Sequence, residues 1–106
     1  MNDPNAIFDQ IVSQMTARPG VTAAKMFGLP TLKVNGKAFS CLYQGEMVFK
    51  LGGEAHSRAL SLEGAVLFDP TGRGRLMREW VQLPAIHAAE WPGLAKEACE
   101  YVARIT

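Results

Sequence analysis

Residues able to catalyse a reaction are few in this 106-residue chain. The two cysteines, Cys41 and Cys99, are far apart, and no histidine flanks Cys41. A thiol becomes a nucleophile only when a nearby base or cation lowers its pKa. His56 and His87 are also far apart and form no motif typical of a zinc site. We therefore expect no catalytic, cofactor or metal site, and an enzyme of unknown reaction is the least favoured alternative.

Binding is better supported than catalysis, because basic residues are concentrated in two segments. Residues 21–51 hold four lysines against one glutamate, and residues 71–83 hold three arginines against one glutamate. If these segments form neighbouring strands, one rim of the sheet is basic, with Trp80 and Tyr43 as aromatic platforms for an anion or nucleotide. The candidate ligand-binding or partner-binding residues are Lys25, Phe27, Lys50, Arg73, Arg75, Arg78 and Trp80.

A structural explanation competes with each of these binding roles. The basic residues are then ordinary solvated charges, and Phe27 belongs to the core beside Gly28, which takes a backbone conformation denied to other residues. The glycines of residues 71–75 could hold a phosphate through backbone amides, but phosphate-binding loops of this kind open onto a helix. Because residues 75–83 favour a strand, a plain turn is the preferred interpretation.

Composition defines the class of protein more firmly than any motif does. The chain is 48% hydrophobic and 20% charged, with a formal net charge of +1, as in one globular domain. This balance excludes a strongly basic arm, an acidic tail and a disordered polyelectrolyte. No apolar stretch approaches the ~20 residues of a membrane span, and residues 1–5 do not begin a secretory signal. We expect a cytoplasmic protein with reduced, buried thiols.

Hydrophobic patterning predicts one α+β domain over residues 1–106. A first helix is capped by Asp3 and ends at Arg18, because Pro19-Gly20 follows it. Turn signals at Asn35-Gly36 and Gln44-Gly45 predict an antiparallel meander. The expected strands are residues 21–27, 31–34, 37–43, 46–51 and 65–68, and the further expected helices are residues 54–62 and a C-terminal helix that begins near Pro92. Residues 75–83 favour a sixth strand, with a short helix as the alternative.

The two tight turns also predict which residues share a face of the sheet. One face is expected to hold Leu32, Val34, Phe39, Cys41, Val48 and Lys50, and the other Ala38, Leu42, Met47, Phe49 and Leu51. Both sets contain large apolar side chains, whereas a sheet with one solvated face would alternate more cleanly. We therefore expect a helix, a partner subunit or a ligand to cover the second face.

Three sequence blocks carry a family resemblance. They are Lys25-Met26-Phe27-Gly28, the hairpin of residues 32–39 with its Ala38-Phe39 pair, and the strand of residues 48–51 that ends in Lys-Leu. A less specific match continues through Phe68-Asp69-Pro70, Arg75, Met77 and Glu79-Trp80-Val81, so that it covers residues 18–103. In these blocks the chain resembles the N-terminal domain family of TfoX/Sxy proteins.

The resemblance implies a central antiparallel sheet with helices packed on it, as in YjbR-like and secretion-chaperone-like folds. Members named for the family are bacterial regulators of competence, and many are stand-alone proteins without an assigned activity. We expect the chain to lack the C-terminal helical domain of the longer regulators, and Leu29 follows Gly28 where many relatives have a second glycine. We expect a stand-alone, non-enzymatic module that forms a homodimer or binds another protein. Binding of a small anion is the alternative, and binding of nucleic acid is disfavoured.

Overall fold

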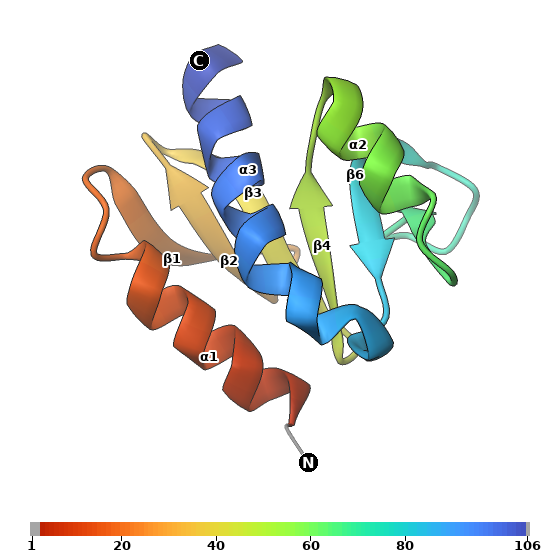
Figure 1. Ribbon diagram of the computed structural model, residues 1–106, viewed down its shortest axis with the longest axis horizontal. Helices are drawn as coiled ribbons and strands as arrows, with labels where there is room; N and C mark the ends of the chain where they lie inside the picture. The colour runs from red at the N-terminus through yellow and green to blue at the C-terminus, as the bar shows by residue number, and fades with distance from the viewer. Residues whose placement is uncertain (1–2, 106) are drawn as a thin grey trace.

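The helices and strands form an α+β arrangement in which runs of consecutive strands lie between the helices along the chain, and a computed structural model describes it for residues 3–105 (Figure 1). Met1, Asn2 and Thr106, which the single-domain prediction includes, lie outside the described residues. The helices are α1 (Pro4–Met15), α2 (Gly53–Leu60), the 3-10 helix η1 (Ala85–Glu90) and α3 (Trp91–Ile105). The strands are β1 (Val21–Met26), β2 (Leu29–Val34), β3 (Lys37–Tyr43), β4 (Glu46–Lys50), β5 (Val66–Phe68) and β6 (Met77–Leu83).

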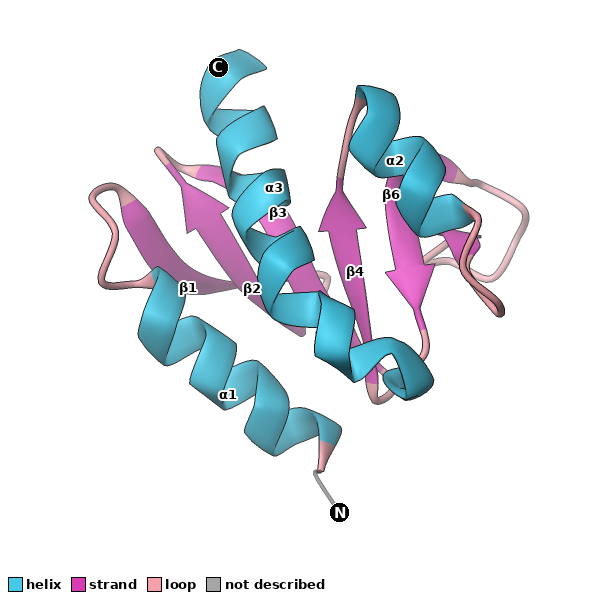
Figure 2. Ribbon diagram, viewed as in Figure 1, coloured by secondary structure: helices cyan, strands magenta, loops and turns pink. Residues whose placement is uncertain are grey.

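Within residues 3–105 the strands form one six-stranded antiparallel sheet in the order β1-β2-β3-β4-β6-β5. Helices α1, α2 and α3 lie on one side of this sheet, here called the helix face (Figure 2). The opposite side is called the far face. The main core lies between the sheet and the helices, where Trp91, Phe39 and Phe49 are fully buried. The predicted fold class is therefore confirmed, including its N-terminal, middle and C-terminal helices.

Helix α1 begins as predicted and ends earlier than predicted. The Asp3 side chain caps it by accepting the Asn5 backbone N–H at 3.2 Å. The helix ends at Met15 rather than Arg18, because the Arg18 N–H turns back to the Met15 carbonyl at 3.0 Å. The chain therefore leaves the helix before it reaches Pro19, and the following turn leads directly into β1.

Three two-residue turns connect the first four strands. Those at Asn35-Gly36 and Gln44-Gly45 were predicted, whereas the third, at Phe27-Gly28, was expected only as a longer connection over residues 28–30. The first residue of each turn has a positive φ, namely 54° at Phe27, 51° at Asn35 and 51° at Gln44. Positive φ at both central positions is the requirement of a type I′ hairpin. The shorter turn at Phe27-Gly28 explains why β1 ends at Met26 and β2 begins at Leu29.

The predicted faces of the sheet are wrong for the residues before Ser40, because β3 contains a β-bulge. Leu32 pairs with Ser40 but Lys33 pairs with Ala38, so Phe39 is the extra residue and has no partner in β2. An extra residue reverses the alternation of side chains beyond it. The helix-face core therefore contains Leu32, Val34, Phe39, Leu42, Met47, Phe49 and Leu51, while Ala38, Cys41 and Val48 belong to a separate cluster.

That separate cluster lies on the far face. Its buried members are Cys41, Val48, Phe68 and Trp80, and half-buried Met26, Leu29, Ala38, Tyr43 and Met77 pack around them. The rings of Tyr43 and Phe68 meet edge to face at 5.2 Å, although β4 and β6 separate their strands. The side chains of this cluster cover the centre of the far face. Only the half-buried residues around that centre could still be covered by a partner or ligand, as the sequence led us to expect.

The remaining elements agree with the sequence-based prediction apart from one additional helix, η1, and the end of α2. Residues 77–83 form a strand, as preferred over the short helix, and β6 inserts between β4 and β5. Helix η1 after Pro84 was not predicted, and it leads into α3 at Trp91. Helix α2 ends at Leu60, before the predicted end at Leu62.

Candidate interaction site at the first hairpin

The seven candidate binding residues do not form one site. Lys25 lies on β1 and Lys50 on β4, while Arg78 lies on β6. Three strands separate β1 from β6 in the sheet, so Lys25 cannot share a small ligand with Arg78. A basic rim requires the two basic segments to be neighbours in the sheet. They are neighbours only where β4 pairs with β6, and Lys50 pairs there with Trp80.

The charge of Lys50 is already engaged. Its Nζ atom lies 3.8 Å from a carboxylate oxygen of Glu79. The Tyr101 hydroxyl donates a hydrogen bond to the same carboxylate, which raises the pKa of Tyr101. This arrangement ties the end of β4 to β6 and α3. Lys50 therefore fits a structural role better than that of a free cation for a ligand.

Of the two aromatic platforms expected on the basic rim, Trp80 is buried and Tyr43 is partly covered. Trp80 is only 6% exposed and packs in the far-face cluster. Tyr43 is half-buried, with its ring against Phe68. A base or planar anion stacks only on an aromatic ring whose face is open to solvent. The prediction of Trp80 as an aromatic platform is therefore wrong, because the strand alternation turns it inward.

The loop between β5 and β6 cannot bind a phosphate through its backbone amides, because these amides already donate hydrogen bonds to a carboxylate. Asp69 accepts the backbone N–H groups of Thr71 and Gly72 at 3.0 Å and of Gly74 at 2.7 Å. It also accepts the Thr71 hydroxyl at 2.7 Å, and this bond is the largest cause of its lowered pKa. The preferred interpretation, a plain turn, agrees with these contacts. Arg73, the next residue, is exposed.

The first hairpin presents the most unusual side chain of the molecule. Phe27 is 66% exposed and holds φ at 54°, a region that bulky residues rarely adopt. The interpretation that Phe27 belongs to the core is therefore wrong. Beside it, Lys25 is exposed, and Met26 and Leu29 are half-buried at the rim of the far face. We call Lys25, Met26, Phe27 and Leu29 the hairpin tip.

Strand β1, which leads into the hairpin tip, is an open edge of the sheet. Among residues 3–105 it pairs with β2 on one side and with no strand on the other. Because Met26 and Leu29 flank a two-residue turn, they form a hydrogen-bonded pair, and bonding alternates along β1 from there. Ala23 and Lys25 therefore direct their backbone groups away from β2. An edge of this kind can accept another strand.

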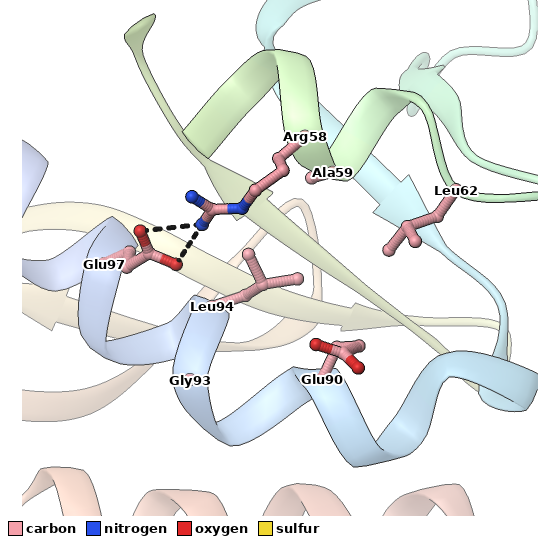
Figure 3. Close-up of a pocket in the computed structure, with 7 residues that line it drawn as sticks. All are labelled: Arg58, Ala59, Leu62, Glu90, Gly93, Leu94 and Glu97. Carbon is pink, nitrogen blue, oxygen red and sulfur yellow. Dashed lines mark hydrogen bonds and ion pairs between the residues drawn. The ribbon is translucent and has the colours of Figure 1, made fainter. Parts of the chain in front are cut away.

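A hollow of about 280 Å³ lies on the helix face between α2 and α3 (Figure 3). Its lining consists of Arg58, Ala59, Leu62, Glu90, Gly93, Leu94 and Glu97. Arg58 Nη2 donates to both carboxylate oxygens of Glu97, at 2.8 and 2.9 Å, so the arginine is not free to hold an anion. The lining contains no cysteine, serine or histidine. We therefore place the candidate site at the hairpin tip rather than in this hollow.

The two cysteine thiols are buried, and the two histidine imidazoles lie against backbone carbonyl groups. Burial raises the pKa of the Cys41 thiol to about 12 and also raises that of Cys99, which opposes formation of a thiolate. His56 and His87 each place Nε2 2.7 Å from a backbone carbonyl oxygen. In the part of the chain that the structure describes, no three histidine, cysteine or acidic side chains group as metal ligands.

Comparisons of the chain with protein-family models, with curated proteins and with solved structures found no match. The class that the structure defines is accordingly an α+β domain with a six-stranded antiparallel sheet. The TfoX/Sxy resemblance stays a prediction. Between residues 3 and 105, no helix has the length and apolar composition needed to cross a bilayer.

Sequence reasoning identified Phe27 and Lys25 but not what makes them unusual. A signal was present, because two strand-forming segments flank Phe27-Gly28 just as others flank Asn35-Gly36 and Gln44-Gly45. An aromatic residue at the first position of a two-residue turn must be strained and cannot point into the core.

Proposed function

We propose that this chain is a non-enzymatic protein-interaction module of the TfoX/Sxy type that acts as a homodimer. The observation that carries the proposal is Phe27, a bulky side chain that is 66% exposed in a left-handed backbone conformation. Asparagine would fit the same turn with less strain, as Asn35 does in the next hairpin. A residue that weakens the isolated fold and exposes an apolar ring is typical of a contact surface.

The open edge of β1 supports a second copy of this chain as the partner. When two β1 strands pair antiparallel around a two-fold axis at Ala24, Ala23 of each copy faces Lys25 of the other. The outward backbone groups of these residues then form the new ladder. In this register Phe27 lies opposite Val21 of the second copy, and the two Lys25 residues do not face each other. The pairing therefore joins the edge and the hairpin tip in one interface.

Sedimentation velocity over a concentration series tests this proposal. We expect the unmodified chain to be a dimer at about 100 µM, and Phe27→Asn and Ala23→Pro to be monomers under the same conditions. Proline at position 23 removes an outward N–H while an edge strand tolerates it. The matched control is Ile86→Asn, since Ile86 is 73% exposed on η1 and should leave the dimer intact. A chain that remains monomeric throughout the series contradicts the homodimer.

A further inference from the structure

We propose that the loop between β5 and β6 is a preformed docking site for a segment of another protein. This segment contains both acidic and apolar residues. The proposal starts from Asp69, whose carboxylate binds the loop from inside. Its contacts to Thr71, Gly72 and Gly74 span 2.7 to 3.0 Å. The Arg73 N–H adds a bond to the Thr71 hydroxyl oxygen at 3.1 Å. The backbone of residues 69–74 is thus held in one conformation.

This fixed loop presents positive charge outward. Arg73 and Arg75 are exposed in the loop, and Arg78 is exposed near the start of β6. None of the three is in an ion pair with the residues that the structure describes. The Asp69 carboxylate accepts hydrogen bonds from backbone N–H groups of the loop, and residues 69–78 hold three arginines against this one aspartate, so the loop is basic.

The chemistry of the loop favours an acidic peptide over other anions. Arginine binds carboxylates through paired N–H donors, and Leu76, 51% exposed among the arginines, offers an apolar contact. A free phosphate would need the loop amides that Asp69 already holds. A nucleic acid would gain no stacking from Trp80, which is buried. An alternating acidic and apolar segment satisfies both the arginines and Leu76.

The fixed backbone adds to affinity because a rigid loop loses less conformational entropy on binding. Gly72 and Gly74 hold φ at 68° and 82°, and the intervening Arg73 is exposed. If Asp69 were removed, the arginines would stay but their arrangement would be lost. The inference concerns a surface separate from Phe27, so it does not depend on the homodimer.

Fluorescence anisotropy with a labelled peptide of alternating glutamate, aspartate and leucine tests the inference. We expect binding at low salt, no binding of the glutamine and asparagine version, and about tenfold weaker binding by the Arg73→Gln, Arg75→Gln double variant. The matched control is Arg104→Gln, which removes an exposed arginine from α3 and should leave the affinity unchanged. The Phe27→Asn variant should bind like the unmodified chain.

The decisive variant is Asp69→Ala. It makes the protein more positive, so simple charge attraction predicts tighter binding of the acidic peptide. A preformed loop predicts the reverse, a severalfold weaker affinity, because the arginines are no longer held in place. Circular dichroism confirms that the variant remains folded. Unchanged or tighter binding by Asp69→Ala overturns the proposal, as does stronger binding of a single-stranded oligonucleotide with the same charge.

Discussion

Phe27, Asn35 and Gln44 occupy equivalent positions in three hairpins, and their side chains differ sharply. All three have φ between 51° and 54°, yet only Phe27 is aromatic. Polar side chains suit such turns because they can hydrogen-bond to the nearby backbone or to water. The aromatic ring gains neither, and it is exposed. Residue 27 is therefore the place where the preference of the local turn and the sequence disagree.

Phe27→Asn should stabilise the monomer. Asparagine tolerates the left-handed conformation that strains phenylalanine, so we expect about 1 kcal/mol of added stability and a melting temperature about 5 °C higher. Urea unfolding at a concentration where both proteins are monomeric measures the difference. Gln44→Asn, at the equivalent turn position, is the control and should give a smaller gain. A less stable Phe27→Asn protein would mean that the ring packs against its own domain.

Gly52 is required for a different reason, which is space rather than φ. A Cβ atom at this position would overlap the ring of Tyr101, whereas its backbone is in an ordinary extended conformation. We expect Gly52→Ala to lower the free energy of unfolding by about 1–3 kcal/mol. In a Tyr101→Ala background the same change should cost much less, and a double-mutant cycle by urea unfolding measures the coupling. Gly93→Ala on α3, where no atom lies within 4 Å of the new Cβ, is the control and should not destabilise.

At the scale of elements, the sequence predicted the turns better than the faces. Asn35-Gly36 specifies its hairpin through backbone chemistry that one dipeptide contains. The bulge at Phe39 depends on which side chains fit the core against α3, and no local pattern records that. Because the period of a strand is two, this one extra residue was enough to move Leu32, Val34 and Phe39 to the face of Leu42 and to leave Ala38 on the face of Cys41.

The loop after β5 should lose its internal hydrogen bonds in acid, at a pH below the ordinary pKa of an aspartate. Hydrogen bonds lower the pKa of Asp69, so their stabilisation is present above the ordinary pKa of an aspartate and is lost as the pH falls through the lowered value. NMR titration of the Gly72 and Gly74 amides should show a midpoint below that of a free aspartate. Asp69→Asn should abolish the transition. A midpoint at the ordinary value would show that the carboxylate does not hold the loop in solution.

At the scale of the whole molecule, charges are arranged by layer. Ion pairs tie α3 to its neighbours, with Arg58 of α2 bound to Glu97 and Arg18, in the turn after α1, beside Glu100. The exposed arginines of the loop before β6 lie at the β5 end of the sheet, opposite the β1 edge. The sequence could identify the basic segments, but only the strand order shows that Lys25 and Arg78 lie apart. Grouping residues into sites required long-range pairing, which no local motif reports.

The three two-residue turns also bear on how the chain reaches its native state. Strands β1, β2 and β3 each pair with the next strand in sequence, so little chain entropy is lost when each hairpin closes. Strand β6 must instead find β4 after α2 and β5 have intervened, and α3 must then cover β3. Local pairings form faster than distant ones. The meander that carries Phe27 is thus the part of the protein able to assemble first, and its open edge exists before the remainder of the domain is complete.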